Sequence, residues 1–185
     1  HMKPEKTTFK LAPVYKRMNV YFIQGVATKV HPDEGEQFVE VNKANGDSVR
    51  VEYDYLLVAT GPKLNFAGTP GLGPDQGENT YSVCSLPHVL QTRDKYLEYV
   101  ERMKKGEKVK MVIGTGHPSA TCQGAAFEFI VNVHKDLVNK GVRDKAELLW
   151  LSNEAALGDF GVRGIHANYQ GKLTSSEEFI SAVFK

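Results

Sequence analysis

This sequence has little excess charge, no long apolar run and few cysteines. Its 23 basic and 22 acidic residues leave a formal net charge of +1, which is too small to indicate binding to nucleic acid or to an anionic membrane. No run of about 18 apolar residues occurs, so we predict no membrane-spanning helix, and no signal peptide is visible. These absences favour a cytoplasmic location.

The two cysteines, Cys84 and Cys122, are too few for a disulfide scaffold in 185 residues. They therefore favour redox or structural roles. The length allows one large domain or two small ones with a substantial core. No internal repeat or low-complexity segment interrupts the chain.

The most informative stretch is Gly114–Phe129, GTGHPSATCQGAAFEF. An apolar strand-like run, Lys108–Ile113, precedes it, and a run with helical spacing, Phe127–Lys140, follows. Strand, glycine turn and helix are the parts of a dinucleotide-binding unit, in which the second glycine lets the backbone approach a pyrophosphate at the helix N-terminus. Two glycines also occur at many ordinary strand-to-helix turns, so the pattern alone is a weak indication.

This turn departs from the nucleotide-binding pattern. Ser119 stands at the third glycine position, and Pro118 removes one N–H group. Cys122 then opens the helix, where the positive end of the helix dipole favours a thiolate. We interpret the turn as a nucleotide cradle altered to present a thiol, although a buried cysteine is more often an inert apolar residue.

The first third of the chain predicts an antiparallel meander after an irregular segment, Lys3–Lys16. Asn19–Val30 is expected to form a strand, with Gly25 marking a bulge or a close approach by another backbone. Gln37–Val41 and Ser48–Tyr53 supply two more strands around a hairpin turn at Asn45–Gly46.

Tyr55–Val58 is a continuous apolar run of the kind that forms a strand buried on both faces. It ends in Ala59, Thr60 and Gly61. Small residues at the carboxyl end of such a strand allow a ligand to approach closely, although a simple turn explains them equally well.

Residues 64–79 are rich in glycine and proline and predict a loop. A helix should follow from an N-cap at Ser85 to about Lys105, with Leu90, Leu97 and Val100 toward the core and Gly106 ending it. Cys84 thus also lies just before a helix. His88 lies one turn further on and faces either the same cavity or solvent.

Glu147–Ser152 predicts a second buried strand, parallel to Lys108–Ile113 in a right-handed βαβ unit. Residues 153–172 should be irregular, and Thr174–Lys185 should form a helix. The predicted class is α/β, with a Rossmann-like parallel sheet and an antiparallel β-meander. Because the βα pattern stops on a helix, we expect a piece of a larger enzyme.

Several stretches resemble the sulfide:quinone oxidoreductases, which are flavoproteins with two dinucleotide-binding domains. These stretches are YDYLLVATGPKLNF, YSVCSLPHVL, VIGTGHPSATCQGAAFEF, KGVRDKAELLWLSNE and GDFGVRG, and they lie within residues 53–165. The resemblance implies a partial FAD-binding lobe with the meander over residues 1–62, a linker over 63–79, and an incomplete second Rossmann-like domain over 80–185.

The same resemblance implies that FAD carries electrons from sulfide to a membrane quinone. Cys122 matches a cysteine of the redox-active pair and Cys84 one nearer the flavin edge, while the third cysteine lies beyond this chain. His88 and Glu128 match polar residues near the sulfide site. FAD contacts are implied for the strand end and for the meander: Ala59, Thr60 and Gly61, then Val26 and Ala27. No metal is implied, and a homo-oligomer is compatible with the family.

Three departures from the family pattern are visible: no GxGxxG for FAD, no C-terminal quinone-binding and membrane-docking segment, and Asp159 where some relatives carry histidine. We therefore expect this chain to bind FAD weakly or not at all, and any peripheral membrane contact to use segments it lacks. A type II NADH dehydrogenase is an alternative, but Pro118 and Ser119 make NAD(P) unexpected. A non-catalytic Rossmann-like module is another.

Overall fold

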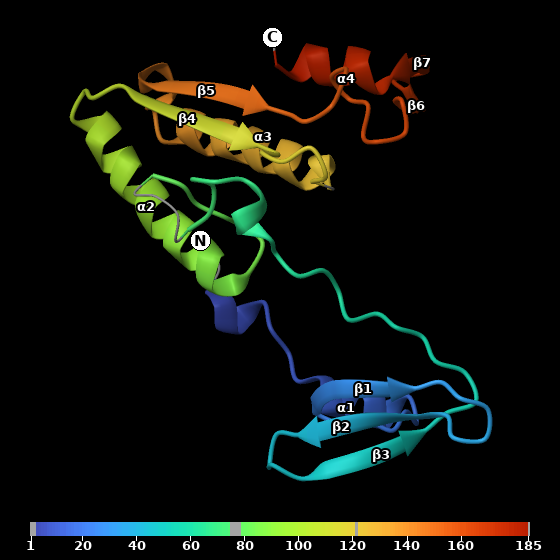
Figure 1. The fold of residues 1–185 in the computed structure, drawn as a ribbon. Coiled ribbons are helices and arrows are strands. Elements are labelled where there is room, and N and C mark those ends of the chain that lie inside the picture. Colours follow the sequence, from blue (N-terminus) through green and yellow to red (C-terminus); the bar gives the residue numbers. More distant parts are fainter. Residues whose placement is uncertain (1–2, 75–78, 121, 185) are drawn as a thin grey trace. The chain divides into compact units, whose positions relative to one another are not determined.

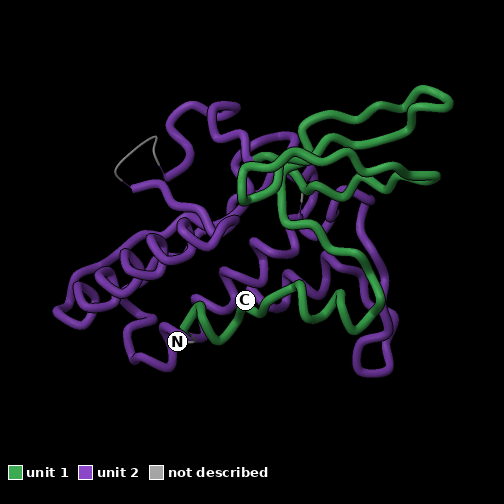
Figure 2. The backbone as a smooth tube through the Cα atoms, turned by 90° about the horizontal axis from the view of Figure 1, so that it is seen from below, with its two compact units in different colours: residues 1–63 green, residues 64–185 purple. Residues whose placement is uncertain are grey.

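The computed structural model describes residues 3–74, 79–120 and 122–184 of the chain (Figure 1). Its residues divide into two compact units, 1–63 and 64–185, which Figure 2 distinguishes by colour. The first unit carries the meander, and the second carries both cysteines.

The predicted meander is confirmed in the first unit. Its strands are β1 (Gly25–His31), β2 (Phe38–Lys43) and β3 (Ser48–Glu52), paired antiparallel in that order. The hairpin turn falls at Asn45–Gly46 as predicted. Gly46 has a φ of +93°, a conformation that glycine adopts without steric cost.

Gly25 was predicted to mark a close approach, and it does. A Cβ atom at this position would lie 2.5 Å from the carbonyl oxygen of Asn42 on β2. The register of β1 against β2 also shifts between Ala27 and Lys29, which is a bulge. Val26 and Ala27 are exposed on this strand.

The N-terminal segment differs from the prediction. A short 3-10 turn, Pro4–Lys6, and helix α1 (Leu11–Arg17) stand where an irregular lead-in was expected. Pro13 makes a helix unexpected from the sequence. It lies in the first turn, however, where its missing N–H breaks no helical hydrogen bond. Asn19, with a φ of +55°, follows the helix, and the strand begins only at Gly25.

The strand predicted at Tyr55–Val58 is wrong. These residues form no strand in the structure, and Tyr55 and Leu57 are 96% and 89% exposed. An apolar run is buried on both faces only where strands on either side hydrogen-bond to it. None of the strands in the described part of the chain pairs with this run.

The second unit contains the predicted βαβ arrangement. Strands β4 (Val109–Gly114) and β5 (Ala146–Leu151) are parallel, and helix α3 (Gln123–Asn139) connects them and packs on the sheet. Helix α2 (Leu86–Lys104) contributes to the same core. The buried core residues are Val100, Met103, Val109, Val133, Leu137, Val142 and Ala146.

The boundaries of α2 follow the sequence closely. The Ser85 side chain caps the helix by accepting a hydrogen bond from the His88 N–H, and Gly106 follows the C-cap with a φ of +95°. Val100 is fully buried, whereas Leu90 and Leu97 are half-buried.

The α/β class is confirmed, while a full Rossmann sheet remains a prediction because the parallel sheet has two strands among the described residues. The prediction that Glu147–Ser152 forms a buried strand holds for one face of β5 only, and β4 is likewise covered on one face. Met111 and Leu148 pack against the core, but Val112, Leu149 and Leu151 are exposed. The apolar sequence runs therefore supply two apolar faces, of which one is covered.

The segment after β5 is more ordered than predicted. Strands β6 (His166–Tyr169) and β7 (Lys172–Ser175) form an antiparallel hairpin inside and just beyond the stretch expected to be irregular. Gln170 and Gly171 turn the chain with φ values of +51° and +80°. The final helix, α4 (Ser176–Val183), is confirmed. None of the described helices is long and apolar enough to cross a membrane.

Candidate functional site

A pocket of about 540 Å³ lies at the carboxyl ends of β4 and β5. Three segments line it: the turn after β4, the first residues of α3 and the loop after β5. The lining residues are Pro118, Ser119, Ala120, Cys122, Gln123, Asn153, Glu154, Ala155, Asp159, Phe160 and Gly161. Ligands of open α/β sheets bind at this edge, which makes the pocket the candidate site.

The turn begins at Gly114, where the backbone of β5 leaves no space for a side chain on β4. A Cβ atom on Gly114 would overlap the carbonyl oxygen of Leu151 on β5. That carbonyl also accepts a hydrogen bond from the Thr115 N–H at 2.9 Å. Glycine is therefore required here by strand pairing.

The space beside the second glycine of the turn is filled by protein. A Cβ atom on Gly116 would lie 2.7 Å from a methyl carbon of Leu72, a residue of the loop after residue 63. The predicted reason for this glycine was the approach of a pyrophosphate. In the structure, it makes room for the Leu72 side chain.

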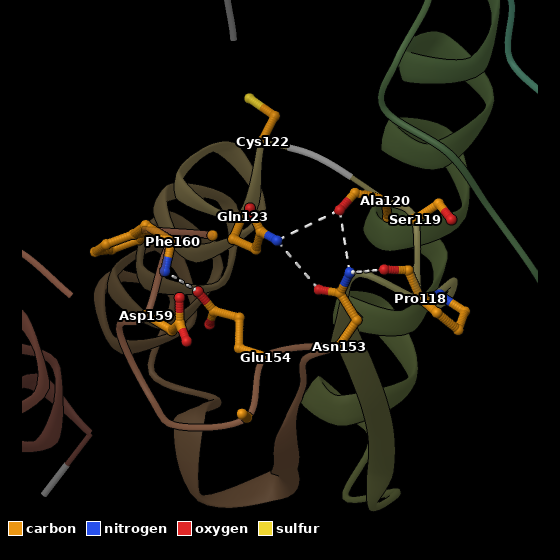
Figure 3. Close-up of a pocket in the computed structure, with 11 residues that line it drawn as sticks. Pro118, Ser119, Ala120, Cys122, Gln123, Asn153, Glu154, Asp159 and Phe160 are labelled. Atoms are coloured by element: carbon orange, nitrogen blue, oxygen red, sulfur yellow. Dashed lines mark hydrogen bonds between the residues drawn. The ribbon is translucent and has the colours of Figure 1, made fainter. Parts of the chain in front are cut away.

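Asn153 holds the turn in place from the loop after β5 (Figure 3). Its side-chain nitrogen donates to three carbonyl oxygens, those of His117, Pro118 and Ala120, each at 3.0 Å. An amide has two hydrogens, so these acceptors share them. Asn153 was not singled out from the sequence, where its only signal was a polar residue following the end of a predicted parallel strand.

The acceptor side of Asn153 is also used. Its Oδ1 accepts from the Thr115 hydroxyl at 2.9 Å and from the Gln123 amide at 3.2 Å. Thr115 and Gln123 are both buried polar residues. A buried polar network whose groups are satisfied stiffens the backbone that it joins.

Two N–H groups in the middle of the turn are committed to protein acceptors. The Ser119 N–H donates to Nδ1 of His117 at 3.0 Å, and the Ala120 N–H donates to the His117 carbonyl at 2.9 Å. Pro118 has no N–H group. A pyrophosphate needs inward-facing N–H donors, whereas this turn directs carbonyl oxygens toward Asn153.

Cys122 occupies the N-cap position of α3 in an unusual conformation. Its φ and ψ are 67° and 44°, in the left-handed region, which costs a non-glycine residue about 1 kcal/mol or more. The residue is exposed, and its sulfur points away from Asn153 (Figure 3). The predicted placement at the start of the helix is confirmed.

Two carboxylates, Glu154 and Asp159, line the pocket opposite the turn. Glu154 accepts hydrogen bonds from the Ser152 hydroxyl, at 2.9 Å, and from the Phe160 N–H. Asp159 accepts from the Arg163 N–H at 2.9 Å. Both side chains therefore shape the loop after β5, and Glu154 was not singled out from the sequence.

The other predicted catalytic residues lie outside this lining. Cys84 is exposed just before the Ser85 cap, and Glu128 is exposed on α3. His88 is half-buried with its ring centroid 5.6 Å from that of Phe66, and its Nδ1 is buried without a hydrogen-bond partner among the described residues.

The residues predicted to contact FAD lie in the first unit. Val26 and Ala27 are on β1, and residues 59–61 are exposed and belong to no helix or strand. The structure thus places the predicted cofactor contacts and the predicted redox residues in different units.

No family model matches the chain. A sulfide-quinone reductase from Aquifex aeolicus (strain VF5) is 36% identical to it over 166 residues, which are 90% of this chain and 35% of the relative. The chain thus spans about a third of the length of the curated relative it matches. This match confirms the resemblance indicated by the sequence motifs.

Proposed function

We propose that this chain belongs to a flavin-dependent sulfide:quinone oxidoreductase and supplies its redox-active thiol, Cys122. The observation that carries the proposal is the position of Cys122 at the N-terminus of α3, lining a pocket at the carboxyl ends of two parallel strands. A helix N-terminus favours the thiolate, which is the reactive form.

The reaction would begin at a disulfide formed by Cys122 and a cysteine outside this chain. A hydrosulfide ion attacks one sulfur, the S–S bond breaks, and one cysteine becomes a persulfide while the other leaves as a thiolate. The two electrons released from sulfide then reside on that thiolate. Cys84, exposed at the start of α2, is the proposed helper thiol, and His88 and Glu128 are the proposed polar groups of the sulfide site.

The first unit offers residues that fit FAD. The backbone groups of residues 59–61 make no hydrogen bond with any other described residue, and a Cβ atom on Gly61 would meet nothing within 4 Å. Small side chains at Ala59 and Thr60 leave this backbone open to a ligand, and exposed Val26 and Ala27 offer a second contact. FAD, when bound, supplies the two-electron acceptor that passes electrons on to a quinone.

Reduction by NADH is the main alternative, and the turn after β4 opposes it. The N–H groups of Ser119 and Ala120 already donate to protein acceptors, and Pro118 has no N–H group to donate. The Leu72 side chain fills the space at Gly116. The carbonyls directed at Asn153 would repel a pyrophosphate. We therefore infer that sulfide, and not a nicotinamide, reduces the enzyme.

The test is anaerobic reduction of the intact enzyme that contains this chain. Flavin absorbance bands in the purified protein would separate an enzyme from a non-catalytic module. We expect sulfide to bleach those bands and added quinone to restore them, with NADH having no effect at equal concentration. Bleaching by NADH but not by sulfide would establish the NADH dehydrogenase alternative.

A further inference from the structure

We propose that Asn153 is a positioning residue for the Cys122 thiol, an inference that rests on the proposed role of Cys122. Cys122 holds its left-handed conformation at the N-cap without a side-chain capping hydrogen bond. Something else must fix the backbone there, because a strained conformation persists only where its surroundings determine it.

The contacts of Asn153 bracket Cys122 in the sequence. Ala120, on one side, gives its carbonyl to the Asn153 amide at 3.0 Å. Gln123, on the other side, donates to Asn153 Oδ1 at 3.2 Å and to the Ala120 carbonyl at 3.3 Å. The side chains of Asn153 and Gln123 and the carbonyl of Ala120 therefore form a triangle of hydrogen bonds whose members lie on both sides of Cys122 in the sequence (Figure 3).

Asn153 is itself anchored to the sheet. The Thr115 hydroxyl donates to Asn153 Oδ1 at 2.9 Å, and the Thr115 N–H bonds to Leu151 on β5. Asn153 thus transmits the rigid geometry of β4 and β5 to the start of α3. Because the Cys122 side chain is already exposed, loosening this linkage adds little access and chiefly removes the thiol from the helix N-terminus.

The test uses this 185-residue chain and needs neither flavin nor turnover. Iodoacetamide labelling of each cysteine is followed by mass spectrometry from pH 6 to 9. Asn153→Ala should slow Cys122 labelling at neutral pH at least threefold and move its pH profile upward, with Cys84 labelling unchanged. Thr115→Val, which removes one hydroxyl donor without changing shape, should have a smaller effect in the same direction.

Asn168→Ala, at an exposed position on β6, is the matched control and should leave both cysteines unchanged. Equal labelling of Cys122 in the Asn153 variant and the native chain, or faster labelling, would overturn the proposal. Two other results would show that Asn153 has a purely structural role and would also overturn the proposal. One is an equal change in the labelling rates of both cysteines, and the other is a lowered melting temperature with an unchanged pH profile of Cys122 labelling. Failure of the proposed function is a separate result, because it would appear as normal turnover of a Cys122 variant.

Discussion

Gly114 shows how a single residue can be fixed by strand pairing. Any side chain there would overlap the Leu151 carbonyl, so Gly114→Ala should force β4 and β5 apart at their carboxyl ends. We expect a loss of about 2 kcal/mol or more in the free energy of unfolding, measured by urea denaturation.

Gly124 is the matched control, because a Cβ atom at that helical position meets nothing within 4 Å. Gly124→Ala should be neutral or should stabilise the chain by up to about 1 kcal/mol. Equal effects of the two substitutions would show that the close approach at Gly114 does not limit stability.

Asp136 joins α2 to α3 by accepting a hydrogen bond from the Tyr96 hydroxyl at 2.6 Å, and it pairs with Lys140 on its own helix. Burial alone would raise the pKa of Asp136, but the hydrogen bonds from Lys140 and Tyr96 outweigh it and hold the pKa below its usual value. A carboxyl group with a lowered native pKa stabilises the fold above its unfolded pKa of about 3.9. That stabilisation is lost as the pH falls through the native pKa.

Asp136→Asn should therefore lower stability most near pH 7, and the difference from the native chain should shrink as the pH falls below about 4. Urea midpoints measured against pH test this expectation. Asp94→Asn, which removes a surface carboxylate paired with its neighbour Arg93, should change stability little at any pH. A constant difference between the Asp136 variant and the native chain at all pH values would contradict the assignment.

How far single residues were predictable depends on how local their causes are. Both cysteines were placed correctly at helix starts, because caps and glycine stops are read from neighbouring residues. Asn153 was missed because its role depends on residues more than 25 positions earlier in the chain. Only the folded backbone brings these residues together.

Among the elements, α4 has the most complete sequence signal. The Ser175 hydroxyl accepts from the Glu178 N–H, and the Glu178 carboxylate accepts from the Ser175 N–H, which is a capping box. Ser175→Ala should cost about 1 kcal/mol of helix stability and expose the C-terminal segment to limited proteolysis.

Ser181→Ala, within the same helix, is the control for the loss of a serine hydroxyl and should not accelerate cleavage. Equal cleavage rates in both variants would show that the capping box does not determine the stability of α4.

Two elements show where sequence patterns mislead. The β6–β7 hairpin escaped prediction because its strands have four residues each and its turn, Gln170–Gly171, is not one of the strongest hairpin signals. Tyr55–Val58 was wrongly predicted as a strand because its apolar character indicates only that its side chains are suited to burial. It does not report whether a pairing partner is present.

In the chain as a whole, the two compact units carry different groups of the proposed functional residues. The first carries the residues proposed to contact FAD, and the second carries the proposed redox thiols. The chain contains no GxGxxG sequence, the usual pyrophosphate cradle of a dinucleotide-binding unit.

We therefore expect this 185-residue chain to bind FAD weakly or not at all. Absorbance of the purified chain after addition of FAD and gel filtration measures the flavin retained. Stoichiometric retention would show that residues 59–61 and the meander suffice for binding, contrary to this expectation.

Cys122→Ser in the intact enzyme that contains this chain tests directly whether Cys122 is the redox-active thiol. We expect sulfide-dependent quinone reduction to be abolished while bound FAD is retained, because the substitution removes the reactive sulfur and leaves the residues proposed to hold FAD unchanged. Near-normal turnover of the serine variant would contradict this expectation and would leave Cys122 as a residue that only packs at the start of α3.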